Sequence, residues 1–131
     1  MSDILVCHND DRGSLLALNR FSELSFFPKR IFSVIDVPKG VVRGEHAHYI
    51  TKQLLVCIKG EIEVGLYNKE ISKVVCLKQG DTVYIDEMTW AYQKFLTGKD
   101  FLMVLASTEH DPEDYIIDRY VFDNLIKTDI L

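Results

Sequence analysis

Two of the four histidines in this chain, His46 and His48, lie two residues apart, and Arg43 precedes them by three residues. In an extended strand, residues i and i+2 project from the same face, so both imidazoles would share one side and Ala47 would point away. Imidazole titrates near neutral pH, which suits proton transfer as well as metal binding. The alternative is that the two histidines lie on a solvent-exposed strand face without a functional role, but the flanking glycines and the nearby arginine disfavour it.

The rest of the chain predicts the strands that must position this pair. Short apolar runs are separated by turn signals such as Pro38-Lys39-Gly40 and Gln79-Gly80-Asp81. The runs cover residues 4–7, 14–18, 30–37, 53–58, 61–67, 71–77, 82–85, 90–95 and 101–106. Many short strands at regular spacing favour a sandwich, jelly roll or barrel. Only residues 120–127 have a helical pattern, with an apolar stripe of Val121, Leu125 and Phe122. The predicted class is all-β with a short C-terminal helix.

Length and composition set further limits. The 131 residues fit one domain spanning 1–131, and the net charge of −5 disfavours nucleic-acid binding. No apolar run approaches the roughly 18 residues of a membrane span, and the N-terminus lacks the pattern of a signal peptide. The odd number of cysteines (Cys7, Cys57 and Cys76) favours reduced thiols in a cytoplasmic protein. We expect Cys57 and Cys76 to be buried in their strands.

The spacing around the histidine pair resembles the first motif of the cupin superfamily. Five residues separate Gly40 from His46, four separate His48 from Gln53, and six separate Gln53 from Gly60. A fainter second motif begins at Gly80. In metal-binding cupins a glutamate stands at the position of Gln53, and a third histidine stands near Ala91. Since two of the usual four ligands are missing, we expect neither a metal nor another cofactor.

A closer resemblance covers nearly the whole chain. Its segments are Asp11-Arg12-Gly13-Ser14-Leu15, Lys29-Arg30, Arg43-Gly44-Glu45-His46-Ala47-His48, Gln53-Leu54-Leu55-Val56-Cys57, Met103-Val104-Leu105-Ala106-Ser107 and Asp114-Tyr115-Ile116. Together they resemble the sugar 3,4-ketoisomerases that act on dTDP-4-keto-6-deoxyglucose. The resemblance implies a cupin (jelly-roll) β-barrel, a homodimer and a place in the synthesis of dTDP-3-amino-3,6-dideoxy sugars for lipopolysaccharide O-antigen or another glycan. The product would then pass to an aminotransferase. One departure is Tyr49, where relatives carry lysine.

This reaction assigns roles to the candidate residues. We expect His48 to be the base, and His46 to be a proton relay or a partner that contacts the sugar oxygen, although the sequence alone does not order the two histidines. Arg43 would stabilise negative charge on oxygen. The configuration at C4 of the product also stays open. We expect substrate binding by a second set of residues, namely Arg30, Gln53, Tyr84, Trp90 and Arg12. His8 and His110 are expected at the surface.

Three alternatives remain. A dTDP-sugar 3,5-epimerase would share the fold and the substrate, but it would pair a histidine with a buried aspartate and use a tyrosine acid, and no such pair is evident beside His46 or His48. A non-catalytic sugar-binding cupin would use the histidines only as hydrogen-bond partners. A metal-dependent oxygenase is the third.

Overall fold

The computed structural model describes residues 4–128. Its elements, in chain order, are β1 (Leu5–Asp10), β2 (Gly13–Leu18), the 3-10 turn η2 (Phe21–Glu23), β3 (Arg30–Ile35), β4 (Val42–His48), β5 (Gln53–Lys59), β6 (Glu61–Tyr67), β7 (Ser72–Lys78), β8 (Thr82–Ile85), β9 (Trp90–Phe95), β10 (Phe101–Ala106), the 3-10 turn η3 (Pro112–Asp114), β11 (Tyr115–Ile116) and α1 (Arg119–Thr128).

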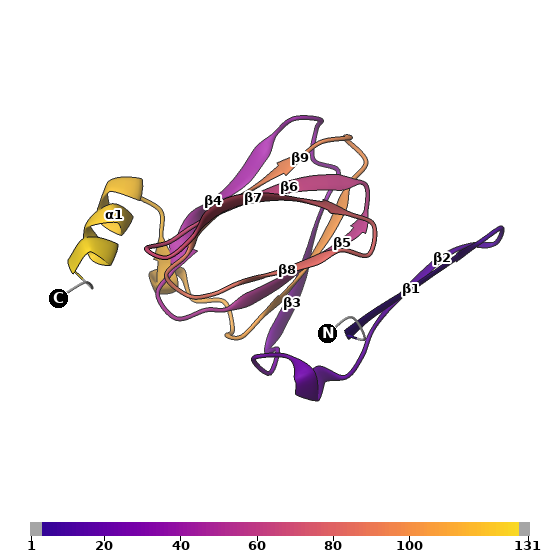
Figure 1. Cartoon of the computed structure of the whole chain (residues 1–131), viewed down its shortest axis with the longest axis horizontal. Coiled ribbons are helices and arrows are strands. Elements are labelled where there is room, and N and C mark those ends of the chain that lie inside the picture. The colour runs from indigo at the N-terminus through magenta and orange to yellow at the C-terminus, as the bar shows by residue number, and fades with distance from the viewer. Residues whose placement is uncertain (1–3, 129–131) are drawn as a thin grey trace.

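Two antiparallel sheets face each other to form the barrel in Figure 1. One has the strand order β3-β10-β5-β8, and the other has the order β11-β4-β9-β6-β7. Apart from the hairpin of β6 and β7, neighbours in these two sheets come from distant parts of the chain, as in a jelly roll. The predicted cupin barrel with a C-terminal helix is confirmed.

The space between the sheets is filled at one end by an apolar cluster that includes Leu55, Ile62, Val64, Phe95 and Leu102. Apolar and polar side chains alternate at the start of β6, so one face of this strand can join the cluster. Ile62 and Val64 are buried in the cluster, whereas Glu61 and Glu63 on the other face of β6 retain contact with water. Burying such side chains supplies most of the driving force for folding.

The outer face of β4 and β9 is covered by α1, which lies beside the barrel in Figure 1. Asp118 caps this helix by accepting hydrogen bonds from the backbone N–H groups of Tyr120 at 2.8 Å and Val121 at 3.3 Å. Phe122 and Ile126, one turn apart, are buried against Ala47. The predicted apolar stripe was therefore wrong in one member, because Val121 turns outward and is exposed.

The hairpin of β1 and β2 extends away from the barrel on the side opposite α1 (Figure 1). It pairs only with itself among the described strands. Apolar side chains at its base, including Leu5 and Leu18, pack on the outer face of β5 and β10 around Leu54 and Leu105. This second cover explains the uninterrupted apolar runs in β5 and β10, because both faces of these strands are covered.

The predicted strands agree with the structure to within one or two residues at most ends. β4 was not among the predicted runs and was only assumed to be extended when the two histidines were placed on one face, and β11 was not predicted. All three cysteines are free; Cys57 is buried as expected, whereas Cys76 is exposed and that expectation was wrong. No helix within residues 4–128 has the length and apolar character needed to cross a membrane.

Candidate active site

The histidine pair faces the inside of the barrel. His46 and His48 belong to β4, where Ala47 between them is fully buried on the opposite face beneath α1. Both imidazoles line a cavity of about 310 Å³ between the two sheets. This volume lies at the lower end of the range for small-molecule sites, which is about 300–1,000 Å³. The polar residues that line it are Arg43, His46, His48, Gln53, Thr89, Gln93 and Tyr115.

A β-bulge in β4 brings Arg43 to the same face as the histidines. In the pairing of β4 with β9, Arg43 lies opposite Gln93 and His46 lies opposite Ala91, so two residues of β4 oppose one of β9. Without the extra residue, a side chain three positions before His46 would point out of the barrel. Gly44, at the bulge, has a φ of +72°, a conformation that glycine adopts without strain.

A buried carboxylate stands behind His48. Asp114 Oδ2 lies 3.0 Å from His48 Nδ1, and it also accepts a hydrogen bond from Thr51 Oγ1. Asp114 Oδ1 accepts a hydrogen bond of 2.8 Å from the backbone N–H of Ile50. Burial alone would raise the pKa of Asp114, but these hydrogen bonds and the neighbouring imidazole outweigh it and hold the pKa below its ordinary value. The carboxylate is therefore ionised at neutral pH.

Both histidines are neutral at neutral pH. Burial, followed by the neighbouring charge of His48, lowers the pKa of His46 to about 4. Burial also lowers the pKa of His48, although the hydrogen bond and the charge of Asp114 oppose the shift. Two ring nitrogens, His46 Nδ1 and His48 Nε2, are buried without a hydrogen-bond partner among the described residues. Buried polar atoms are normally satisfied, so these nitrogens indicate a binding site for a polar ligand.

Tyr115 packs on both imidazoles. Its ring centroid lies 4.4 Å from that of His48 and 5.0 Å from that of His46. In the pairing of β11 with β4, Tyr115 lies opposite His48, so the two side chains share one face. A phenol against two basic rings provides a third group that can carry a proton.

Arg30 approaches the same region from β3. Its Nη1 lies 3.0 Å from Nδ1 of His110, and its guanidinium lies over the ring of Phe32, which lines the cavity. Arg30 Nε is buried without a partner among the described residues, and the positive charge of Arg30 contributes to lowering the pKa of His48. His110 is exposed as predicted, yet it also contacts Tyr115, with ring centroids 5.9 Å apart.

The four positions that hold the metal in metal-binding cupins converge on this cavity. Here they present the imidazoles of His46 and His48, the amide of Gln53 and the methyl group of Ala91. Two imidazoles and one amide oxygen make a weak donor set for a divalent cation. Within the described ranges, no three His, Cys, Asp or Glu side chains are grouped as metal ligands.

Three of the residues predicted to bind substrate lie away from this cavity in the single chain. Tyr84 lies on the outside of β8, where its ring meets Phe26 at a centroid distance of 6.2 Å, because Val83 and Ile85 take the inward positions. Trp90 lies on the outer face of β9 beneath α1 and packs against Phe122. Arg12 forms an ion pair of 2.7 Å with Asp10 at the tip of the β1–β2 hairpin. By contrast, Arg43 and Gln53, which were also predicted to act in the site, line the cavity.

Asp114, Tyr115 and Thr51 were missed as site residues. Asp114 and Tyr115 were recognised only as part of a matching segment, and the absence of a histidine–aspartate pair was used against an epimerase. That premise was wrong, because Asp114 lies beside His48. The outward position of Trp90, by contrast, could have been predicted from the sequence. If Ala91 faces the cavity, the neighbouring residue Trp90 must face outward, because successive residues of a strand point to opposite faces.

Comparisons with known proteins agree with the fold. The cavity lined by two strand histidines inside a jelly-roll barrel defines a cupin. The chain belongs to the FdtA family described as WxcM-like, C-terminal, whose model matches residues 1–127.

The relatives are sugar isomerases. A TDP-4-oxo-6-deoxy-alpha-D-glucose-3,4-oxoisomerase from Aneurinibacillus thermoaerophilus is 32% identical over 108 residues, which cover 82% of this chain and 78% of that protein. The crystal structure of a 3,4-ketoisomerase from Helicobacter canadensis is 30% identical, with a TM-score of 0.82 and coverage of 94% and 93%. A variant of the 3,4-ketoisomerase QdtA from Thermoanaerobacterium thermosaccharolyticum, in complex with TDP-4-keto-6-deoxyglucose, is 26% identical, with a TM-score of 0.84 and coverage of 95% and 91%.

Proposed function

We propose that this protein is a dTDP-4-keto-6-deoxyglucose 3,4-ketoisomerase that moves the carbonyl from C4 to C3. The observation that carries the proposal is the His46–His48 pair at the cavity. Both rings are neutral, each has one buried nitrogen without a hydrogen-bond partner among the described residues, and the carboxylate of Asp114 lies behind His48. The activity named for the similar protein from Aneurinibacillus supports this substrate, and the activity named for the protein from Helicobacter supports a 3,4-ketoisomerisation.

The chemistry follows from the two unpartnered nitrogens. The C3 hydrogen is acidified by the ketone at C4, and Nε2 of His48 removes it as the base. The electron pair of the C3–H bond forms a C3=C4 double bond, and the C4 carbonyl oxygen becomes an enediolate oxygen. His46 relays a proton from the C3 hydroxyl to that oxygen. The protonated His48, whose proton exchanges with solvent, then delivers a proton to C4 and returns to its neutral form, which gives a 3-keto, 4-hydroxy sugar, so no redox partner is required.

Negative charge on the enediolate needs stabilisation within the cavity. Arg43 lines it and carries a permanent positive charge, and Gln53 supplies an amide N–H for a sugar oxygen. Arg30 is suited to the diphosphate, because a guanidinium binds phosphate oxygens in pairs and its Nε is unpartnered.

The test is an NMR time course of the purified protein with dTDP-4-keto-6-deoxyglucose in deuterated water, with and without a chelator. We expect solvent deuterium at C4 and a new 3-keto species, with no effect of the chelator. The configuration at C4 of the product, galacto or gluco, is read from the same spectra. A complete lack of exchange would contradict the proposal and favour a sugar-binding module, and sensitivity to the chelator would contradict metal-free catalysis.

One observation favours a second candidate function, the 3,5-epimerase. The His48–Asp114 pair with Tyr115 beside it matches the acid–base set expected of that activity. Exchange at C3 and C5 with the ketone left at C4 would identify the epimerase.

We also propose a homodimer. An isolated two-stranded hairpin is marginal in water, yet β1 and β2 project from the barrel with Leu15 59% exposed. The edge strand β3 also leaves Ile31 and Ile35 more than half exposed. If the hairpin packs on a second copy, Arg12 at its tip and Tyr84 on the outer face of β8 gain neighbours that the single chain lacks. Light scattering tests the mass, and a monomer at working concentration would contradict the dimer.

The remaining expectations concern the setting of the reaction. A 3-keto sugar is the substrate class of a pyridoxal-type aminotransferase, so we propose that such an enzyme consumes the product. Three free thiols support a cytoplasmic location.

A further inference from the structure

The segment that carries Asp114 is tied to the end of β4 by its backbone as well as by its side chain. The backbone N–H of Tyr49 donates to the carbonyl oxygen of Asp114 at 2.9 Å, and that of Ile50 donates to its carboxylate at 2.8 Å. Asp114 is 6% exposed and ends the 3-10 turn η3 immediately before β11. The carboxylate therefore has a fixed position relative to His48, which ends β4.

The hydrogen bonds around this carboxylate run in one direction. An ionised carboxylate only accepts hydrogen bonds. The hydroxyl of Thr51 must therefore give its single hydrogen to Asp114 Oδ2. Thr108 Oγ1, 2.7 Å from Thr51 Oγ1, must then be the donor to Thr51. The chain Thr108–Thr51–Asp114 is thus an ordered set of donors that ends at the carboxylate.

The same reasoning fixes the tautomer of His48. Its Nδ1 lies 3.0 Å from an atom that can only accept, so Nδ1 carries the hydrogen in the neutral ring. Nε2 then holds a lone pair, and this is the nitrogen that is buried and unpartnered. His46 differs, because its Nδ1 has no partner among the described residues and nothing selects one tautomer there.

We infer that Asp114 is a positioning residue that holds His48 as the Nδ1–H tautomer with Nε2 as its basic atom, and that Thr51 in turn orients the carboxylate. This assignment rests on the proposed function, in which Nε2 of His48 takes the proton from the sugar. Once protonated, the imidazolium of His48 is paired with Asp114, which stabilises the product of that step. The pairing with Asp114 gives His48 one defined basic nitrogen, whereas no hydrogen bond among the described residues selects a tautomer of His46.

The direct test is nitrogen NMR of protein labelled with ¹⁵N-histidine, without substrate, above pH 7. We expect the nitrogens of His48 to report a protonated Nδ1 and an unprotonated Nε2, assigned by comparison with His48→Asn. In Asp114→Asn, the tautomer preference should shift towards Nε2–H. An Nε2–H tautomer in the unaltered protein, or no shift in a folded Asp114→Asn variant, would overturn the inference.

Kinetics supply a readout that a purely structural role would not change. Asp114→Asn should lower kcat by roughly 10²- to 10⁴-fold with little change in KM, as expected when a base loses its orienting partner. The acid limb of kcat/KM should move to lower pH, because Asp114 raises the pKa of His48 and its charge is removed. An unchanged kcat and acid limb would contradict the positioning role.

A second pair of variants tests the inference even if Asp114→Asn does not fold. Thr51→Val removes the donor to the carboxylate but keeps Asp114, and it should lower kcat by about 10-fold, whereas Thr51→Ser keeps the hydroxyl and should restore the rate. Equal rates for Thr51→Val and Thr51→Ser would overturn the orienting role of Thr51. The tautomer measurement needs no substrate, so it succeeds or fails independently of whether dTDP-4-keto-6-deoxyglucose is turned over.

Discussion

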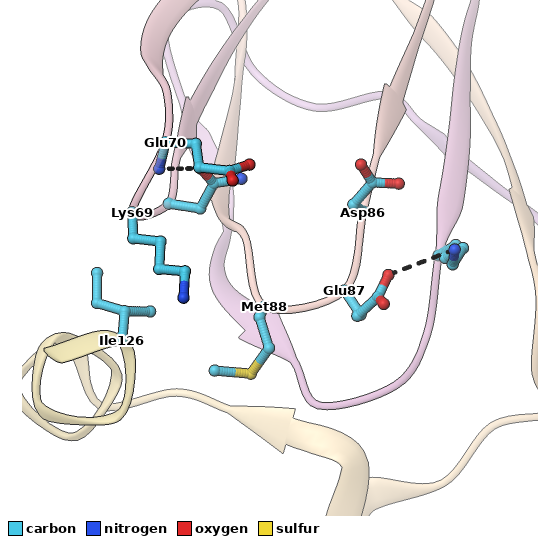
Figure 2. Close-up of a pocket in the computed structure, with 8 residues that line it drawn as sticks. Lys69, Glu70, Asp86, Glu87, Met88 and Ile126 are labelled. Atoms are coloured by element: carbon cyan, nitrogen blue, oxygen red, sulfur yellow. Dashed lines mark hydrogen bonds and ion pairs between the residues drawn. The ribbon is translucent and has the colours of Figure 1, made fainter. Parts of the chain in front are cut away.

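Two hollows of similar size on this molecule differ in whether they contain buried polar atoms that lack hydrogen-bond partners. The cavity inside the barrel (about 310 Å³) holds the buried, unpartnered nitrogens of His46 and His48. Figure 2 shows the other, a groove of about 260 Å³ in front of α1, lined by Lys69, Glu70, Asp86, Glu87, Met88 and Ile126 among others.

In this surface groove no side-chain nitrogen or oxygen of the described residues is both buried and without a hydrogen-bond partner, and several polar groups are paired with one another. Lys52 Nζ lies 3.6 Å from Glu87 Oε1, with both side chains more than a third exposed. The side chain of Asn68 donates to Thr89 and accepts from the backbone N–H groups of Glu70 and Ile71. A candidate active site is therefore distinguished by buried polar atoms without partners, and not by the volume of the cavity. The following predictions test that distinction.

The largest effect is expected from His48→Asn. This change removes the proposed basic nitrogen while keeping a polar side chain, so kcat should fall by roughly 10³-fold or more. Binding of TDP, measured by calorimetry, should stay within a few-fold, because the nucleotide does not require the imidazole. Activity near that of the unaltered protein would remove His48 from its role as the base.

Arg43→Ala should follow, with a loss of about 10²-fold in kcat/KM on the keto sugar. The reason is the loss of the positive charge that faces the developing enediolate. Arg43→Lys retains the charge but not the forked geometry, so it should recover only part of the rate. If Arg43→Ala and the unaltered protein had equal kcat/KM, the charge would have no part in the reaction.

Gly44→Ala tests the bulge that aims Arg43 into the cavity. The new Cβ would displace Oε1 of Gln93, the movable end of that side chain, and alanine adopts a φ of +72° only with strain. We expect a loss of about 1–3 kcal/mol in the free energy of unfolding, measured with urea, together with lower activity. Gly98→Ala is the matched control, since it has a φ of +81° without a close contact and lies outside the cavity. It should lose stability but keep its kcat.

The low pKa of His46 predicts a stability that depends on pH. Because folding depresses this pKa from 6.5 to about 4, the folded state binds fewer protons than the unfolded state between these values. Stability is therefore complete above pH 6.5 and is lost as the pH falls towards 4, by about 1–2 kcal/mol after allowance for partial exposure of the ring. Urea titrations across this window should show the loss, and His46→Gln should show less of it.

The smallest effect is expected in the surface groove. Glu87→Gln, Lys52→Met and the double variant should give a coupling energy of about 0–1 kcal/mol, as for other exposed ion pairs. The kcat values should stay within about twofold of the unaltered protein. A loss of activity comparable to that of Arg43→Ala would contradict the contrast between the two hollows.

Sequence reasoning recovered the parts of the fold and site that local spacing determines. The i, i+2 spacing predicted that His46 and His48 share a face, and the cupin spacing brought Gln53 and Ala91 to the same cavity. It could not find Asp114, which lies 66 residues from His48 and reaches it through the two-residue strand β11. A strand of that length has no periodicity to detect. Tyr84 and Trp90 were assigned by residue type, whereas strand alternation turns both outward.

The bulge at Gly44 also affects how related sequences are aligned. Between Arg43 and His46, β4 has one residue more than the paired part of β9. The spacing of these two residues therefore determines whether the arginine faces the cavity. A relative with an arginine three residues before this histidine but no bulge in the strand would direct that arginine away from the cavity, because alternate residues of a regular strand point to opposite faces. Alignments of this family therefore need the bulge residue treated as an insertion, and an arginine aligned by residue count alone does not by itself indicate the same role.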